Sequence, residues 1–225
     1  MRRPLVVADY GRMRYADALV LQQHFIDARK RGEGEDTLLF LEHPHVVTMG
    51  RNGKESNVLA SPDVLARTGI DYFETNRGGD VTYHGPGQLV GYPIVDLREW
   101  RRDVRAYFHG VEQSLIDALA VFGITAERIQ ERGYEGVWVN GAKVAAIGVH
   151  ISRWITSHGF ALNIDTDVSY FKYIVPCGLT KPVCSLRSLG CGANRQEVMD
   201  AVAASFANVF QFELVMADQK LQEIR

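Results

Sequence analysis

The sequence predicts an α+β fold, in which a mixed, largely antiparallel sheet is packed with helices. Short apolar segments typical of strands follow one another in runs, and few segments with helical spacing lie between them. A doubly wound fold would instead alternate strands and helices along the chain. The length of 225 residues, with 46% hydrophobic and 23% charged residues, suits a globular protein of one domain, which we expect to span residues 1–225.

The predicted strands are short runs of apolar and β-branched residues bounded by turn residues. In the first half of the chain they are residues 5–8, 37–41, 46–49, 70–75 and 88–96. In the second half, residues 137–144 form a hairpin, and strands follow at residues 149–155 and 159–164. The hairpin turn is Asn140-Gly141, the dipeptide that a two-residue type I′ turn prefers.

Helices are predicted where apolar residues recur at helical spacing or where a capping signal stands. They are residues 14–31, a helix that begins at Ser61-Pro62, residues 103–122 and residues 197–210. Ser61 offers a capping hydroxyl, and Pro62 suits the first helical position. The helix at 103–122 has the clearest apolar side, formed by Val104, Tyr107, Phe108, Val111, Leu115, Leu119 and Phe122.

Charge and cysteine content exclude several classes of function. The net charge of −2 gives no overall basic character, so we expect no nucleic-acid partner. No stretch approaches the ~20 apolar residues that span a bilayer, and the apolar run before Asp9 is too short for a signal peptide. We expect a cytoplasmic protein that contacts no membrane. Its cysteines, Cys177, Cys184 and Cys191, lack the spacing of a zinc site, so we expect free thiols and no metal.

A glycine-rich segment, Arg77-Gly78-Gly79-Asp80-Val81-Thr82-Tyr83-His84-Gly85-Pro86-Gly87-Gln88, lies between two predicted strands. Glycine lets the backbone approach a ligand, and converging amides could stabilise a thioester carbonyl as it becomes an oxyanion. The alternative is an ordinary glycine-rich turn with a structural histidine. It is not a phosphate-binding loop, because Gly-x-x-x-x-Gly-Lys-Ser/Thr is absent from the sequence.

Lys143 stands out because it interrupts an apolar strand. If Asn140-Gly141 is the turn, Lys143 faces Trp138 across the hairpin, and strict alternation places Ile147, Val149 and Ile151 on the same side. Such a lysine more commonly extends from the sheet edge to water. Alternatively it lies in a partly dry pocket, where it could act as a base or stabilise a thiolate by its charge.

Two further segments could carry chemistry. His158 precedes a small residue and an apolar strand, where a structural histidine and a catalytic one are both open. Cys177 stands between Pro176 and Gly178, which predicts a thiol in a defined turn, although cysteine is also a common small buried residue. A free thiol has a pKa of ~8.5, so Cys177 would need a nearby cation to be a good nucleophile at pH 7, and Lys143 is the candidate.

Together these segments resemble the octanoyl-carrier-protein:protein octanoyltransferases, the lipoate–protein ligase B family. The resemblance runs from about residue 38 to residue 179. It depends on residues 77–88, on 141–148, on 158–163, on Pro176-Cys177-Gly178, and on residues 41–44 and 48–51. Each motif alone is weak, and the ordered set is specific. Residues 211–225 match nothing in the family pattern.

The resemblance implies a single acyltransferase catalytic domain with a fold similar to that of biotin and lipoate ligases. Cys177 would take octanoyl from acyl carrier protein as a thioester, and a lysine of a lipoyl domain would then accept it as an amide. Lys143 would lower the pKa of Cys177. No cofactor, ATP or metal is implied. By the same resemblance the acyl pocket would be lined by Arg77, Gly78, Gly79, Asp80, Val81, Thr82, Tyr83, His84, Ala146, Ile147, Gly148, Gly159, Phe160 and Ala161.

The implied partners are octanoyl-acyl carrier protein as donor, and the lipoyl domains of 2-oxoacid dehydrogenase complexes and glycine cleavage H protein as acceptors. A monomer is expected. Residues 97–105 carry four arginines and a tryptophan, and this segment either steers an acidic carrier by charge or is a solvated helix start. Cys184 and Cys191 are expected to be dispensable.

Three competing functions remain open at the level of sequence. The first is an ATP-dependent lipoate or biotin ligase of similar fold, which ATP–pyrophosphate exchange would reveal. The second is a non-catalytic module that binds acylated proteins. The third is a thioesterase that releases the acid to water, which product analysis with and without a lipoyl domain would separate.

Overall fold

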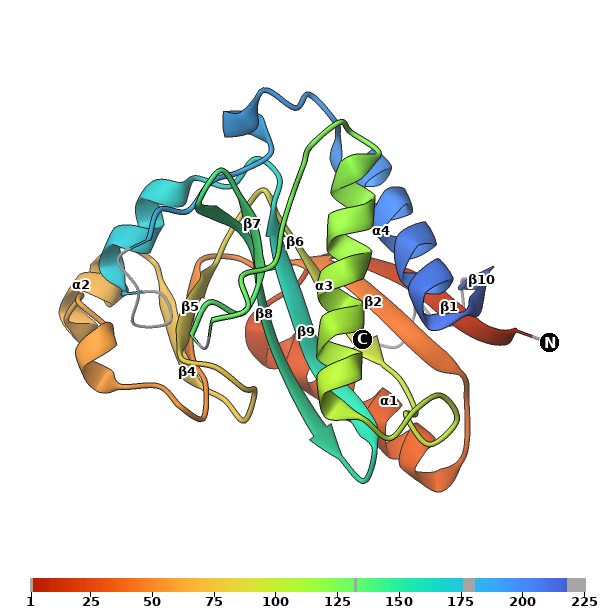
Figure 1. Ribbon diagram of the computed structural model, residues 1–225. Helices are drawn as coiled ribbons and strands as arrows, with labels where there is room; N and C mark the ends of the chain where they lie inside the picture. Colours follow the sequence, from red (N-terminus) through yellow and green to blue (C-terminus); the bar gives the residue numbers. More distant parts are fainter. Residues whose placement is uncertain (1, 132, 176–180, 218–225) are drawn as a thin grey trace.

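The computed structural model describes residues 2–131, 133–175 and 181–217 (Figure 1). A seven-stranded sheet has the order β10-β1-β2-β6-β9-β8-β7, in which β1 pairs in parallel with β10 and β2 and every other pairing is antiparallel. Its strands are β1 (Arg3–Arg12), β2 (Asp36–Glu42), β6 (Gln88–Ile94), β7 (Val137–Val139), β8 (Ala142–Ser152), β9 (Ile155–Asn163) and β10 (Phe212–Met216). The predicted mixed, largely antiparallel α+β fold is confirmed.

Helices cover both faces of this sheet, as Figure 1 shows. On one face α3 (Val104–Ala120) and α4 (Arg195–Phe210) pack over alternate residues of β2 such as Leu38 and Phe40. On the other face α1 (Tyr15–Arg31) packs over Leu39 and Leu41. Because both faces are buried, β2 is a continuous apolar run and not an alternating one.

A smaller sheet lies beside the large one and has the order β4-β3-β5. Its strands are β3 (Val46–Met49), β4 (Asp71–Glu74) and β5 (Val81–His84). They pack with α2 (Pro62–Arg67) and the 3₁₀ helix η2 (Val168–Tyr173) around a separate apolar cluster. The described residues also form the 3₁₀ helices η1 (Glu55–Asn57) and η4 (Arg187–Leu189). Strand β5 lies inside the segment for which the sequence predicted only a loop.

Local capping explains where the helices begin. Ser61 caps α2 by accepting a hydrogen bond from the Val64 amide, with proline at the first turn as predicted. Asp103 caps α3 through the Ala106 amide. Val104 follows this cap and is 51% exposed, so its predicted place on the apolar side of the helix is wrong.

Two tight turns join the last three strands of the antiparallel part. Asn140 and Gly141 have φ angles of 50° and 76°, which confirms the predicted hairpin. Arg153 and Trp154 have φ angles of 53° and 69° and end β8, so the predicted strand at 149–155 is wrong. Neither arginine nor tryptophan is typical of turn positions with positive φ, so this turn could not be recognised from the local sequence. Strand β10, in a segment without a predicted element, completes the sheet by pairing with β1.

No helix in the described part of the chain combines the length and the apolar character needed to cross a bilayer.

Candidate active site

A bulge in β8 decides where Lys143 points. Lys143 pairs with Trp138, as predicted, but Ala145 pairs with Val137, so β8 holds one extra residue at this point. Lys143 consequently lines a small cavity with Ala146, while Ile147 belongs to the core beneath α3 and α4. The expectation from strict alternation, which placed Lys143 on the side of Ile147, is wrong because the bulge changes the face on which the lysine lies.

The amine of Lys143 is held inside the protein, with the residue only 6% exposed. Its Nζ donates to the Glu135 carbonyl at 2.9 Å and lies 4.9 Å from the centre of the Trp138 ring. The alternative in which this lysine extends to water does not hold. The Lys143 amide donates to the Pro182 carbonyl, and the Lys143 carbonyl accepts from the Cys184 amide, so residues 182–184 run beside it.

Cys177, the predicted nucleophile, lies outside the described residues. The described chain ends at Val175, whose amide donates to the Asn57 carbonyl at 2.7 Å, and begins again at Lys181. Of the other cysteines, Cys184 is buried, and burial raises the pKa of its thiol to about 11. A thiol with such a pKa is a poor nucleophile at neutral pH.

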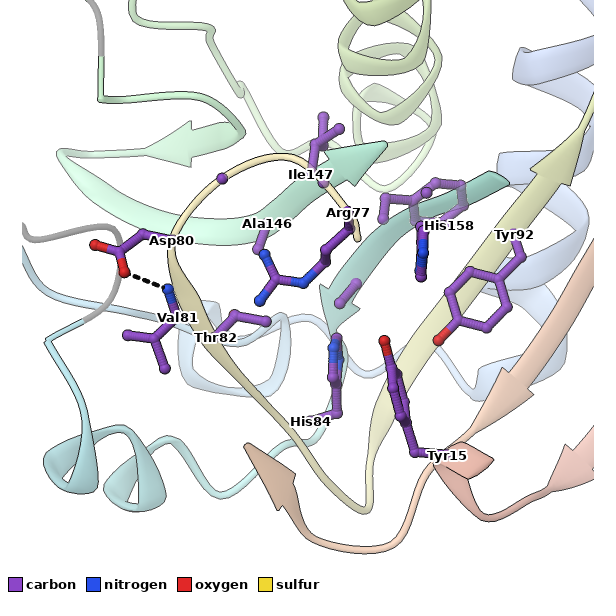
Figure 2. A pocket seen from close by; sticks show the side chains of 15 residues that line it. Tyr15, Arg77, Asp80, Val81, Thr82, His84, Tyr92, Ala146, Ile147 and His158 are labelled. Atoms are coloured by element: carbon purple, nitrogen blue, oxygen red, sulfur yellow. Dashed lines mark hydrogen bonds between the residues drawn. The ribbon is translucent and has the colours of Figure 1, made fainter. Parts of the chain in front are cut away.

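The residues predicted to line an acyl pocket come together around one cavity, with the exception of Gly78 and Tyr83 (Figure 2). Gly78 instead donates its amide to the Val149 carbonyl at 2.9 Å. Tyr83 packs in the small cluster on the other side of β5, where its hydroxyl bonds to His45 Nδ1. Tyr15 and Tyr92 also line the cavity and were missed, because they belong to segments without a recognisable motif. His158, which the sequence left open as structural or catalytic, lines it as well.

Small residues on neighbouring strands open this cavity. Ala146 pairs with Ala161, and Gly148 pairs with Gly159, so two facing pairs lack bulky side chains. A Cβ at Gly148 would lie 3.0 Å from the Gly78 carbonyl oxygen, so glycine lets the loop that follows Arg77 lie against β8. The predicted close approach of the glycine-rich segment is therefore made to the neighbouring strand.

Two charged residues of the glycine-rich segment are held by the protein itself. Arg77 is 7% exposed and donates to the hydroxyl and carbonyl of Thr48 and to the Gly78 carbonyl. Asp80 accepts from the Val81 amide at 2.7 Å and is bonded to the side chain of Asn57. These contacts fix the loop, and the flat guanidinium of Arg77 forms part of the cavity wall (Figure 2).

The buried imidazoles at the cavity are neutral. Burial lowers the pKa of His84 and of His158 to about 3, and that of nearby His43 to about 4. His84 Nδ1 lies 2.7 Å from Gln88 Oε1, and this oxygen can only accept, so Nδ1 carries the proton. The imidazoles of His84 and His158 therefore add no charge to the wall, and the two charged side chains that line it, Arg77 and Asp80, are hydrogen-bonded to other groups of the protein.

A chain of hydrogen bonds links the cavity to the strand that holds Lys143. His84 donates to Gln88, whose Nε2 donates to Asn163 Oδ1 at 2.9 Å. Asn163 Nδ2 then donates to the Cys184 carbonyl at 3.0 Å, and Cys184 is bonded to the backbone of Lys143. The side-chain amides of Gln88 and Asn163 are each fixed by a hydrogen bond on both sides, so the orientation of the His84 ring is coupled to the position of β8.

The arginine-rich segment 97–105 lies at the other end of the β8–β9 hairpin from Lys143, since the Leu97 amide donates to the Trp154 carbonyl in the turn. Arg98 makes a two-pronged contact with Asp96, and Arg101 pairs with Asp103 at 3.0 Å. Charge-guided docking of a carrier at this segment stays a prediction.

Residues 14–207 match the family model of the lipoyl protein ligase A/B catalytic domain. The chain is 59% identical to an octanoyltransferase of Solibacter usitatus over 91% of this chain and 92% of the relative. It is 42% identical to an octanoyltransferase of Desulforamulus reducens over 98% and 97%, respectively.

Solved structures share the fold at low sequence identity. A bipartite lipoate protein ligase from Thermoplasma acidophilum superposes with a TM-score of 0.74 at 15% identity, covering 100% of this chain and 90% of that one. The biotin protein ligase of Aquifex aeolicus gives 0.51 at 12% identity, covering 94% and 70%. The predicted similarity to the catalytic domains of biotin and lipoate ligases is confirmed at the level of the fold.

Proposed function

Because this chain belongs to the lipoyl protein ligase A/B catalytic domain family and is an octanoyltransferase, we propose that it transfers octanoyl through a thioester on Cys177. The donor is octanoyl-acyl carrier protein, and the acceptor is the lysine amine of a lipoyl domain. The acceptors we propose are the lipoyl domains of 2-oxoacid dehydrogenase complexes and the glycine cleavage H protein. The enzyme acts as a monomer, with residues 1–225 as one catalytic domain.

The first step exchanges one thioester for another. The Cys177 thiolate attacks the carbonyl carbon of the donor, a new carbon–sulfur bond forms, and the bond to the carrier's sulfur breaks. The carrier leaves as a thiol with the proton that Cys177 gave up. The ammonium of Lys143 favours the thiolate by its charge and can pass that proton on.

The second step forms the stable product. The acceptor amine attacks the enzyme thioester, a carbon–nitrogen bond forms, and the carbon–sulfur bond to Cys177 breaks. Cys177 returns to the thiolate, and the amine loses a proton to Lys143 or to solvent. The covalent intermediate divides the transfer so that each step needs only one protein partner at the site.

The position of Lys143 is the observation that carries this proposal. Its amine is buried at a small cavity next to the larger cavity described above, since Thr82, Ala146 and Ala161 line both. The chain that follows Cys177 also resumes beside it, because Pro182 and Cys184 bond to the backbone of Lys143. A cation in that place suits a cysteine that must ionise at neutral pH.

Intact-mass analysis after mixing with octanoyl-acyl carrier protein tests the proposal. We expect one octanoyl group on the wild type, none on Cys177→Ala, and a full adduct on Cys184→Ala. An adduct that persists on Cys177→Ala would refute the proposed nucleophile. Adding a lipoyl domain must convert the adduct to an octanoyl amide, whereas release of free octanoate would indicate a thioesterase.

The role of Lys143 is tested by Lys143→Met, which keeps the length of the side chain without its charge. We expect octanoyl loading at pH 7 to fall by roughly 10²-fold or more, in the range of lost proton-transfer groups. The defect should shrink toward pH 9, because a free thiol with a pKa of ~8.5 ionises without help there. A defect of equal size at pH 7 and pH 9 would contradict the thiolate-stabilising role.

A further inference from the structure

Two adjacent cavities follow β9, a small one at the end that holds Lys143 and a larger one that reaches His158. The small cavity at Lys143 is also lined by Asn163, and the larger one by His158 and Gly159. Asn163 and His158 are five residues apart on one strand, which corresponds to about 16 Å at 3.2–3.4 Å per residue. An acyl chain that begins near Lys143 would therefore point its methyl end toward His158.

His158 is fixed at that end by contacts from three parts of the chain. Its Nε2 bonds to Asn76 Oδ1 at 2.7 Å, and its amide donates to Gln22 Oε1 on α1 at 2.8 Å. Its ring meets Tyr92 edge to face at 6.3 Å between centroids, and Figure 2 shows the two side chains next to each other. His158 also has a φ of 55°, a backbone conformation that a non-glycine residue keeps only where its surroundings impose it.

A second hollow lies behind the His158 ring. It has a volume of about 290 Å³ and is lined by α1, by residues 74–76 and by Ser157. Its α1 residues are the apolar Leu19 and Ile26 and the polar Gln22 and Gln23. Within the described residues, His158 is the residue that lines both this hollow and the acyl cavity. The imidazole, hydrogen-bonded to Asn76, therefore separates two spaces that would otherwise adjoin.

We propose that the His158 ring, held by Asn76, is the stop that sets acyl chain length, and that the hollow behind it accepts longer chains when the ring is removed. This inference rests on the proposed acyl transfer. An acyl chain gains from each methylene it buries until it meets a side chain that cannot move. The ring cannot turn away without breaking its bond to Asn76, and charging it would place an unpaired cation in the cavity.

A competition between donors tests the proposal. Acyl carrier proteins charged with saturated acyl groups of eight, ten, twelve and fourteen carbons are mixed in equal amounts with one enzyme. Intact mass then gives the ratio of adducts, and this ratio does not depend on how much of the enzyme is active. His158→Asn is the first variant, because asparagine tolerates the left-handed backbone and is shorter. We expect the ratio of twelve-carbon to eight-carbon adduct to rise roughly tenfold or more.

Asn76→Ala is the second variant, and it should shift the ratio in the same direction by less, since the ring remains but loses its anchor. His150→Asn is the matched control. It removes an imidazole from the same hairpin, but His150 lines neither the cavity nor the hollow, so the ratio of twelve-carbon to eight-carbon adduct should stay at the wild-type value. If His158→Asn does not fold, the ratio of adducts on Asn76→Ala alone tests the proposed stop. A wild type that gains no octanoyl would refute the proposed function, whereas octanoyl loading with unchanged ratios in the folded variants would overturn the stop.

Discussion

The cavity proposed for the acyl group and a charged cluster at the opposite end of β2 both bury titratable groups, and they limit the cost of burying them in different ways. The histidines at or beside the cavity, His43, His84 and His158, are neutral. At the cluster, where β2 begins, Asp36 is 2% exposed and lies 3.0 Å from Arg3 and 3.2 Å from Arg29. The imidazoles are buried without charge, whereas the carboxylate of Asp36 is buried beside arginines.

The two regions also respond to pH with opposite sign. The histidines have pKa values of about 3 to 4 in the folded protein and 6.5 in the unfolded chain. Their contribution to the free energy of unfolding is therefore fully present above pH 6.5 and is lost as the pH falls toward the folded-state values. Burial raises the pKa of Asp36 to about 6 from 3.8, although Arg29 and Arg3 act against it. The contribution of Asp36 to the free energy of unfolding is therefore fully present below pH 3.8 and is lost as the pH rises through 6.

Breaking the charged cluster should have the largest effect on stability. Arg29→Met keeps the stem of the side chain but removes the charge between Asp36 and Asp96, which is also 2% exposed. We expect the free energy of unfolding to fall by roughly 3–5 kcal/mol, as when one partner of a buried ion pair is removed. Urea unfolding followed by circular dichroism measures this.

The control for this prediction is Arg31→Met, two residues along α1. Arg31 pairs with Glu33 on the surface, where both side chains are more than half exposed, so we expect no measurable change. Octanoyl loading per folded molecule should also be unchanged in Arg29→Met, because the cluster lies outside the cavity. Equal unfolding energies for the two variants would show that the cluster stabilises nothing.

The pH dependence of unfolding should separate the two regions by sign. Between pH 5 and 6, His84→Asn should make the rise of stability with pH shallower, because one proton fewer is taken up on unfolding. Asp36→Asn should make the same rise steeper, because it removes the group that acts in the opposite direction. Each change is expected to be about 1 kcal/mol per pH unit, from 1.36 kcal/mol per pKa unit. Urea titrations at three pH values give the slopes, and slopes that change in the same direction would contradict the comparison.

A third variant introduces into the cavity a buried ion pair of the kind found in the charged cluster. Gln88→Glu places a carboxylate 2.7 Å from His84 Nδ1, which should raise the pKa of His84 and favour its cationic form. We expect octanoyl loading, relative to wild type at the same pH, to be about tenfold lower at pH 6 than at pH 8. Gln88→Met removes the hydrogen bonds without adding charge and should lower loading by the same factor at both values. If Gln88→Glu also shows a pH-independent defect, the neutral state of His84 has no bearing on loading.

Features set by neighbouring residues could be predicted from sequence. The Asn140-Gly141 turn and the Ser61-Pro62 helix start depend on backbone preferences within a few residues, and both are present. The bulge beside Lys143 and the turn at Arg153 and Trp154 could not be predicted, because strand pairing imposes them on residues without a local preference. The same limit concealed Tyr15 and Tyr92, which join the cavity only through packing.

By itself the sequence determined the order and type of most elements, the family motifs, and the small and glycine residues that leave room for a cavity. Only the tertiary structure decided which way Lys143 turns, that the imidazoles lose their charge, and which side chains line the cavity. The physical reason is the separation along the sequence of the residues that determine each feature. A turn depends on adjacent residues, whereas the position of His158 in the cavity wall depends in part on the hydrogen bond from its amide to Gln22, which lies 136 residues away. Such contacts form only when distant strands and helices pack in one register.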